Sequence, residues 1–214
     1  MGIVDIVTYW CGQCCTDSGG WAHPDDFEAL EKNPHTFNLE FPVSPYVGDI
    51  LNAPVIILGA NAGYREDRTP TEFPDQAAVD RYLDRVRNPA TTDWSGMAPY
   101  YYGTNYGPLL LDKKAVWINA CAYRSPKLSQ EPQNRRLIRK LPSALFTRRW
   151  LIEAVAPLAE RGDRLIVAKR YGQWNLPSEL KDASGIVFDP APVSRQITSK
   201  PWQEIQRFLG RILR

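Results

Sequence analysis

Short, largely apolar runs recur along the chain at residues 54–58, 115–120, 164–168 and 185–188. None of them alternates polar and apolar positions, as a strand with one face in water would. An unbroken apolar run bounded by glycine or polar residues is typical of a strand that is buried on both faces, as in a parallel sheet. The pattern therefore predicts four buried strands.

Between these runs the apolar residues recur at helical spacing. In residues 75–87 they follow the i, i+3, i+4, i+7 pattern from Val79 onward, which predicts an amphipathic helix. Residues 143–160 and 201–213 show similar apolar faces and predict two more helices. Pro157 is expected to kink or end the helix that contains it, because proline lacks a backbone donor.

Strands that alternate with helices predict the α/β class. We expect a three-layer α/β/α sandwich with a central four-stranded parallel sheet. The length of 214 residues suits a single domain. Residues 1–45 are expected to form an irregular leader packed on this domain, with a short strand over residues 4–10.

Polar side chains follow three of the predicted strands. Asn61 lies in a small-residue turn after the first strand, Asn119 ends the second and Asp189 follows the fourth. Right-handed crossovers bring the carboxyl ends of parallel strands to one edge, where ligands bind. Gly59 and Gly63 would let the backbone turn tightly and approach a ligand closely. The sequence therefore predicts a site at this edge.

Each of these polar residues also has a purely structural interpretation. Asn61 could mark an ordinary turn, because asparagine tolerates left-handed geometry. Asn119 could cap a strand end, and Asp189 could cap a helix.

The long segment at residues 88–108 is rich in glycine and aromatic residues. Segments of this length inside compact domains are usually functional or disordered, and so many rings disfavour disorder. Exposed rings could stack on a nucleobase. The alternative is that they cover the core beside the leader. The rings are Trp94, Tyr100, Tyr101, Tyr102 and Tyr106.

The net charge of +2 hides an asymmetry between the two halves of the chain. Residues 1–112 carry 6 basic and 16 acidic side chains, whereas residues 113–214 carry 20 and 8. Arg135, Arg136 and Arg139 form the densest basic cluster. Such an asymmetry indicates an anionic partner such as nucleic acid, unless the two halves neutralise each other within the fold.

Four cysteines raise the question of a metal site. Cys11 and Cys14 have the spacing of a half-site for zinc or an iron–sulfur cluster, next to Cys15. Cys121 stands alone, so the second half-site is missing. We therefore expect neither a metal nor a disulfide.

The chain shows no other targeting or cofactor signal. No apolar run approaches the roughly 18 residues of a membrane span, and no basic segment followed by an apolar one suggests secretion. Neither the phosphate-binding loop nor the dinucleotide-binding glycine pattern is present. We expect a cytoplasmic monomer that does not contact a membrane.

The order of motifs resembles that of the uracil-DNA glycosylase superfamily over residues 42–210. The motifs are Pro45-Tyr46-Val47-Gly48-Asp49, Gly59-Ala60-Asn61-Ala62-Gly63, Asn119 at the end of the next strand, and Asp189-Pro190-Ala191-Pro192 followed by Ser194. The resemblance implies the same three-layer sandwich. It also implies excision of uracil or another deaminated or mismatched base from a flipped nucleotide in DNA.

By this resemblance, Asn61 would position the attacking water and Asn119 would read a pyrimidine edge. Asp189 departs from the family, and its carboxylate is expected to act in catalysis through its own chemistry, either by favouring a cationic sugar or by accepting from an exocyclic amino group. Gly59, Gly63 and Tyr64 are expected to contact the substrate. Ser194 and Arg195 are expected to contact DNA phosphates, as is the basic cluster of Arg135, Arg136 and Arg139.

Three positions depart from the family pattern. Ala62 replaces a proline, Asp189 replaces the histidine that stabilises the departing base, and Ala191 replaces a serine that contacts phosphate. Some branches hold an iron–sulfur cluster with four cysteines. Cys11, Cys14 and Cys121 match three of those ligands, but a fourth is missing, so no cluster is expected. The alternative function is a catalytically silent protein that binds nucleic acid or nucleotides on the same fold.

Overall fold

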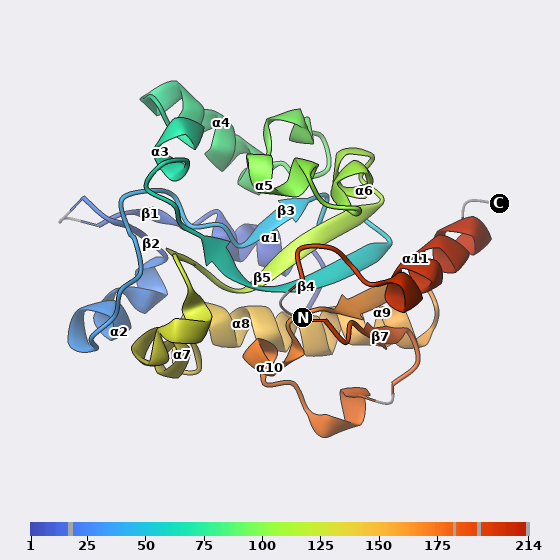
Figure 1. Ribbon diagram of the computed structural model, residues 1–214. Helices are drawn as coiled ribbons and strands as arrows, with labels where there is room; N and C mark the ends of the chain where they lie inside the picture. Colours follow the sequence, from blue (N-terminus) through green and yellow to red (C-terminus); the bar gives the residue numbers. More distant parts are fainter. Residues whose placement is uncertain (17–18, 182, 192–193, 213–214) are drawn as a thin grey trace.

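The computed structural model describes residues 1–16, 19–181, 183–191 and 194–212. Its centre is a five-stranded sheet with the order β3-β5-β4-β6-β7 (Figure 1). The strands are β3 (Tyr46–Gly48), β4 (Val55–Gly63), β5 (Ala115–Ser125), β6 (Leu165–Ala168) and β7 (Ile186–Phe188). The α/β class is confirmed, and β5, β4, β6 and β7 are parallel as predicted.

The predicted count of four strands is wrong, because β3 adds an antiparallel edge to the sheet. Tyr46 pairs with Ile118 and Gly48 pairs with Val116 on β5. Only an extended segment could be predicted here, since two prolines at positions 42 and 45 exclude a helix. Proline is tolerated just before an edge strand, and that is where Pro45 lies.

Strands β4 and β5 are longer than the sequence predicted. Residues 59–63 were expected to form a turn, but they continue β4, where Gly59 pairs with Asn119 and Asn61 pairs with Cys121. A register irregularity follows between Asn61 and Gly63. Because β6 pairs only with Val55–Leu58, the ends of β4 and β5 form a ribbon that extends beyond β6. On the other side of this ribbon, Ser44 and Asn38 donate backbone hydrogen bonds to Ala122 and Arg124 of β5.

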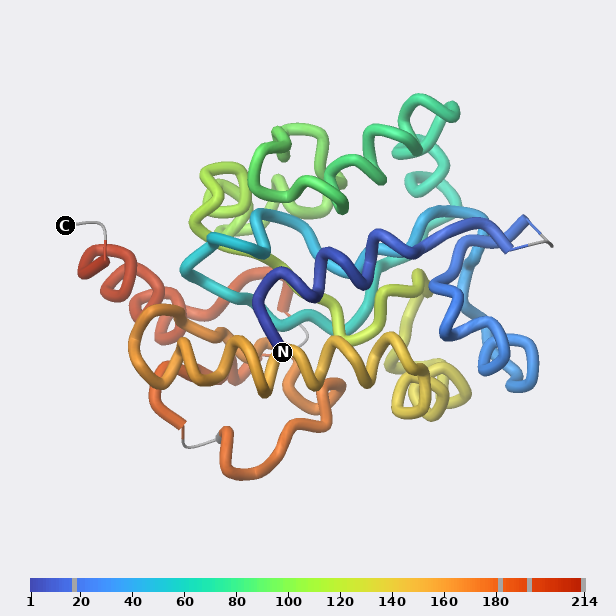
Figure 2. Tube along the Cα trace, turned by 180° about the vertical axis from the view of Figure 1, so that it is seen from behind, coloured from blue at the N-terminus to red at the C-terminus, as the bar shows by residue number. Residues whose placement is uncertain are grey.

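Helices cover both faces of the sheet (Figures 1 and 2). One face carries α3, α4, α5 and α6, and the opposite face carries α7, α8, α9 and α10. Their bounds are α3 (Thr69–Glu72), α4 (Gln76–Arg87), α5 (Pro99–Tyr102), α6 (Gly107–Leu111), α7 (Pro132–Ile138), α8 (Pro142–Trp150), α9 (Ala156–Glu160) and α10 (Tyr171–Trp174). The helix predicted over residues 75–87 is confirmed as α4.

The helix predicted over residues 143–160 is interrupted before Pro157. A π-helical turn at Leu151–Val155 separates α8 from α9, and the N–H of Ala156 donates to the carbonyl of Leu151. This wider turn accommodates a proline that supplies no N–H and crowds the preceding turn. The last helix, α11 (Ser199–Ile212), begins two residues earlier than expected, and Leu213 lies outside the described residues.

The leader differs from its prediction in secondary structure. Residues 4–10 were expected to form a strand, but α1 (Asp5–Trp10) is helical, with Ile6 and Trp10 buried one turn apart. That i, i+4 spacing suits a helix face, whereas a strand would place successive residues on opposite sides. A short hairpin of β1 (Cys14–Cys15) and β2 (Trp21–Ala22) follows, and then α2 (Phe27–Lys32).

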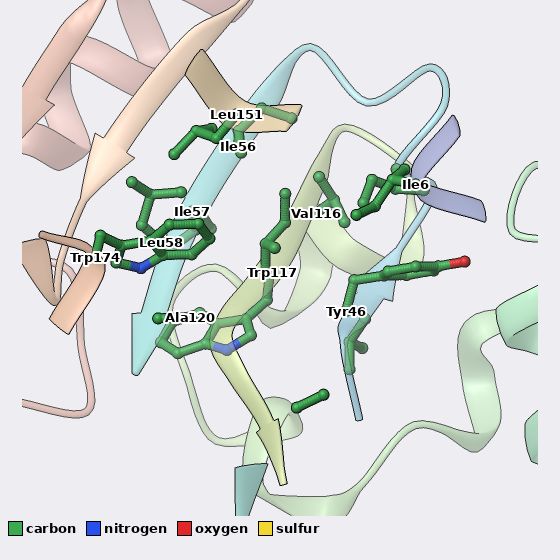
Figure 3. Packing of buried hydrophobic residues seen from close by; sticks show 14 of the residues in the cluster. Ile6, Tyr46, Ile56, Ile57, Leu58, Val116, Trp117, Ala120, Leu151 and Trp174 are labelled. Atoms are coloured by element: carbon green, nitrogen blue, oxygen red, sulfur yellow. The ribbon is translucent and has the colours of Figure 1, made fainter. Parts of the chain in front are cut away.

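The hydrophobic core lies against both faces of the central strands. Figure 3 shows Trp117 of β5 near Ala120, and Trp174 of α10 beside Leu58 of β4. Ile6 of the leader belongs to the same buried cluster, close to Tyr46 and Val116 (Figure 3). Within the described ranges, no helix has the length and apolar character needed to cross a bilayer.

Candidate functional site

Asn61 lies in the ribbon formed by the ends of β4 and β5. Its Nδ2 donates to the carbonyl of Ala62 at 2.7 Å and to Oγ of Ser125 at 2.9 Å. Ser125 is fully buried, whereas Asn61 is half-buried. Within the described chain, the Oδ1 atom of Asn61 accepts no hydrogen bond, so the fixed amide presents a free acceptor.

Aromatic rings and one buried cation lie beside this end of β4. Tyr64 stacks on Phe41 with 6.5 Å between ring centroids, and Phe41 stacks on Phe73 at 5.6 Å. All three rings are half-buried. Arg124 of β5 is only 5% exposed and lies 5.2 Å from the centroid of Phe73. We call Asn61, Phe41, Tyr64, Phe73, Arg124 and Ser125 the strand-end cluster.

The charge of Arg124 is opposed by Glu72, whose carboxylate lies 3.7 Å from Nη1. Burial raises the pKa of Glu72, and Arg124 acts in the opposite direction. Arg124 also donates to the carbonyl of Gly63 at 3.4 Å. Gly63 itself is exposed, and a Cβ atom added to it would meet no atom within 4 Å. The ribbon therefore ends in open space next to the cluster.

Asn119 is held in a different way. Its Oδ1 accepts from Nε1 of Trp117 at 2.8 Å, and its Nδ2 donates to the carbonyl of Ser44 at 2.8 Å. The residue is 2% exposed. Both ends of the amide are therefore engaged within the protein, which is the arrangement expected of a structural cap and not of a base-reading side chain.

Gly59 is paired with Asn119 and is also buried. A Cβ atom at this position would lie 2.4 Å from the indole ring of Trp117. The carbonyl of Gly59 accepts from Nε1 of Trp174 at 2.7 Å. The glycine thus makes room for two indole rings, and its carbonyl is already occupied.

Asp189 is separated from β4 by the whole of β6, which corresponds to about 10 Å across two strand spacings. Its Oδ2 lies 3.0 Å from Nζ of Lys169, and both side chains are almost completely buried. Its Oδ1 accepts from the N–H of Ala191 at 3.0 Å and from Oγ1 of Thr198 at 2.9 Å. The structure therefore does not bring Asp189 together with Asn61 or Asn119.

The ionisation of Asp189 follows from these contacts. Burial acts to raise its pKa, but hydrogen bonds from Ala191, Lys169 and Thr198 outweigh it and hold the pKa below the usual value. Lys169 also donates to the carbonyl of Gln196 at 2.6 Å. The charged pair thus fixes the segment after β7. Pro192, which belongs to the predicted motif, lies outside the described residues.

Ser194 and Arg195 belong to that segment and contact protein groups. The hydroxyl oxygen of Ser194 accepts from the N–H of Gln196 at 3.0 Å. Arg195 donates to the carbonyl of Tyr100 and lies 4.9 Å from the centroid of its ring. Asn105 completes the link by donating to the carbonyl of Ile197 at 2.8 Å. These contacts fasten the aromatic segment 88–108 to the segment after β7.

The three arginines predicted to contact DNA are all exposed. Arg135 and Arg136 lie on α7, and Arg139 follows it. Among the described residues, none of their side chains makes a hydrogen bond or an ion pair, in contrast to the side chain of Arg65, which pairs with Asp67 at 2.7 Å. Helix α7 lies at the end of the molecule where β4 and β5 end (Figure 1).

Comparison of the chain with protein-family models, with curated proteins and with solved structures found no match. The conclusions about function therefore rest on the residues themselves.

The cysteines do not form a recognisable metal site. Cys121 is buried in β5, Cys11 and Cys14 are half-buried in the leader, and Cys15 is exposed. Burial raises the pKa values of the Cys11 and Cys121 thiols, which disfavours their thiolate forms. In the part of the chain that the structure describes, no three His, Cys, Asp or Glu side chains are placed to share a metal ion.

Sequence reasoning missed most of the strand-end cluster. Arg124 and Ser125 follow the second predicted strand by a few residues, and only the extra length of β5 carries them to Asn61. Phe41 and Phe73 come from segments with no regular pattern. A signal was present in the apolar Cys121-Ala122-Tyr123 that follows Ala120, because it allows the strand to continue.

The cluster offers two kinds of interaction to a ligand. The free oxygen of Asn61 can accept a hydrogen bond from a water molecule or from a ring N–H. The rings of Tyr64, Phe41 and Phe73 expose part of their surface for stacking on a flat group. No carboxylate or imidazole belongs to the cluster itself, so its chemistry is that of positioning and not of strong acid–base catalysis.

Proposed function

We propose that the protein binds DNA and hydrolyses the N-glycosidic bond of an unpaired base at the strand-end cluster. The observation that carries the proposal is the half-buried amide of Asn61. Its Nδ2 is fixed by Ser125 while its Oδ1 has no partner among the described residues. The motif order that resembles uracil-DNA glycosylases puts the water-positioning asparagine at this position.

In this reaction Asn61 orients one water molecule toward the anomeric carbon of the sugar. The water oxygen forms a bond to that carbon, while the carbon–nitrogen bond breaks and its electron pair leaves with the base. The water proton is lost to solvent. An amide is a weak base, so the acceleration comes from orientation of the water and from stacking of the base on the rings.

Asn119 and Asp189 have supporting roles in this proposal. The hydrogen bonds of Asn119 hold Trp117 and the segment before β3, and Asp189 anchors the segment after β7 through Lys169. Neither carries an accessible polar atom toward the strand-end cluster. The base is therefore recognised by Asn61 and the aromatic rings.

The exposed arginines of α7 supply the affinity for the DNA backbone in this proposal. Their side chains have no ion-pair partner among the described residues, and α7 lies at the end of the molecule where β4 ends (Figure 1). Phosphate contacts of this kind make binding dependent on salt. For duplex DNA, the logarithm of the binding constant falls with the logarithm of the salt concentration by about 0.9 per contact.

A second candidate is a catalytically silent protein that binds nucleic acid at the same cluster. The observation that favours it is the engagement of Asn119 and Asp189 within the protein, which leaves Asn61 as the single accessible amide of the proposed site.

The test uses labelled oligonucleotides that carry uracil, hypoxanthine, xanthine or mismatched thymine. We expect abasic sites on at least one substrate, and a loss of at least tenfold in rate for Asn61→Ala with unchanged DNA affinity. Salt-dependent binding without any product would contradict the glycosylase proposal and favour the catalytically silent nucleic-acid-binding protein. Absence of DNA binding at low salt would contradict both.

The α7 contribution is tested in the same assay by Arg135→Gln/Arg136→Gln. We expect weaker binding and a salt slope lower by about 2. The matched control is Arg81→Gln/Arg87→Gln, which removes two exposed cations from α4. Equal losses in both double variants would assign the effect to net charge instead of α7.

A further inference from the structure

A hollow of about 460 Å³ lies at the end of the sheet opposite to the strand-end cluster. It is formed where β6 and β7 begin, against α11 and the end of α9. In Figures 1 and 2, α11 and α7 lie at opposite ends of the molecule. The hollow is therefore distinct from the proposed DNA site, and its size is within the range of small-ligand sites.

Three arginines from two separate segments line this hollow. Arg164 immediately precedes β6, and Arg207 and Arg211 lie one turn apart on α11. Among the lining residues that the structure describes, Glu204 is the single acidic side chain, and it lies 2.9 Å from Nη1 of Arg207. The lining therefore carries an excess of two positive charges.

Arg164 is the most informative of the three because it is only 7% exposed. Its guanidinium donates to the carbonyl of Ile50 at 3.2 Å and to the carbonyl of Leu51. No carboxylate in the described residues lies within ion-pair distance of it. Burial lowers its pKa, and the more distant carboxylate of Asp49 acts in the opposite direction. Buried charges are normally paired directly, so an anion in the hollow would add to the partial compensation that Asp49 supplies.

The two arginines of α11 are placed to contact such an anion directly. Arg211 lies 5.3 Å from the ring centroid of Phe208 and donates weakly to the carbonyl of Gly162 at 3.4 Å. The ion pair of Arg207 with Glu204 is solvent-exposed, and pairs of this kind contribute little and can be exchanged. Both guanidinium groups can therefore turn to a ligand without breaking a strong contact.

We propose that this hollow is a binding site for a phosphate-bearing ligand, in which Arg207 and Arg211 contact the phosphate oxygens above Arg164. Guanidinium groups match the geometry of phosphate and bind it through paired hydrogen bonds. The apolar side chains of Leu165 and Val187, which also line the hollow, would contact the remainder of the ligand.

The first test is calorimetric titration with inorganic pyrophosphate at constant ionic strength and without divalent metals. We expect saturable binding, weakened at least tenfold in Arg207→Gln/Arg211→Gln. The control is Arg81→Gln/Arg87→Gln, which removes the same charge from α4 and should bind as the wild type does. Thermal unfolding of each variant verifies that the fold is kept.

Three results would overturn the proposal. The first is no saturable binding at all, and the second is an affinity of Arg207→Gln/Arg211→Gln equal to that of the wild type. The third is an equal loss in both double variants, which would show that general charge and not this hollow attracts the anion.

A second titration distinguishes a small phosphorylated molecule from the phosphorylated end of a nucleic acid. Oligonucleotides with a 5′-phosphate or a 5′-hydroxyl compete against pyrophosphate. If only the phosphorylated strand competes, and Arg207→Gln/Arg211→Gln removes the difference, the ligand is a nucleic acid end. If neither strand competes while pyrophosphate binds, the ligand is a small molecule.

Discussion

Two asparagines in the neighbouring strands β4 and β5 behave in opposite ways. Asn119, in the middle of β5, is 2% exposed and uses both ends of its amide to join Trp117 to the segment before β3. Asn61, near the end of β4, is half-buried and is fixed through Nδ2, and its oxygen has no partner among the described residues. The comparison teaches that residue type does not define a site; the accessibility of the polar atoms does.

Asp189, which follows β7, resembles Asn119 more than Asn61. It is buried, paired with Lys169 and bonded to Thr198. Asn119 and Asp189 therefore serve stability, whereas Asn61 is open to a ligand. Substitutions at the two buried residues should reduce stability, and substitutions at Asn61 should affect ligand binding or chemistry.

The largest effect is expected at the buried pair. Lys169→Met leaves Asp189 buried without its cation and should lower the free energy of unfolding by about 3–5 kcal/mol. Urea unfolding at pH 7 measures this loss. Lys200→Met, at an exposed lysine at the start of α11, is the control and should change stability little.

The same variant has an expected pH dependence. Because the folded-state pKa of Asp189 lies below its usual value, the stabilisation from its ionised form is complete above about pH 4 and is lost as the pH falls through the folded pKa. The stability difference between wild type and Lys169→Met should therefore shrink in acid. A difference below about 1 kcal/mol at pH 7 would contradict the assignment of a structural pair.

The next largest effect is expected at Asn119. Its replacement by alanine leaves the indole N–H of Trp117 and the carbonyl of Ser44 without partners, which should cost about 2–4 kcal/mol. Asn61→Ala removes bonds from a half-buried side chain and should cost about 1 kcal/mol or less. Thermal and urea unfolding compare the two variants. Equal losses would remove the distinction between the enclosed Asn119 and the accessible Asn61.

The parallel sheet could be predicted from the sequence because its strands are continuous apolar runs, as in Val55–Leu58. The edge strand β3 could not, since Tyr46–Gly48 is short and follows prolines, and its pairing with β5 is a tertiary contact. Helix α1 was predicted as a strand because its apolar residues are dense, although Ile6 and Trp10 have helical spacing.

The candidate site was predictable only in part. Asn61 could be singled out because it follows a buried strand and matches a motif. The two hydrogen bonds of the Asn119 amide could not be foreseen, because they depend on Trp117 two residues earlier and on Ser44 from a distant segment. Hydrogen bonds between residues far apart in sequence leave no local pattern, so accessibility had to come from the structure.

The smallest of these effects separates two glycines of β4 that the sequence treats alike. Gly59→Ala places a methyl group 2.4 Å from the ring of Trp117 and should cost about 1–3 kcal/mol by overpacking. Gly63→Ala meets open space and should leave stability within about 0.5 kcal/mol of the wild type. Urea unfolding of both variants tests the contrast. If Gly63→Ala were the more destabilising, the open end of β4 would be packed against other groups, and the strand-end cluster would lose its access to a ligand.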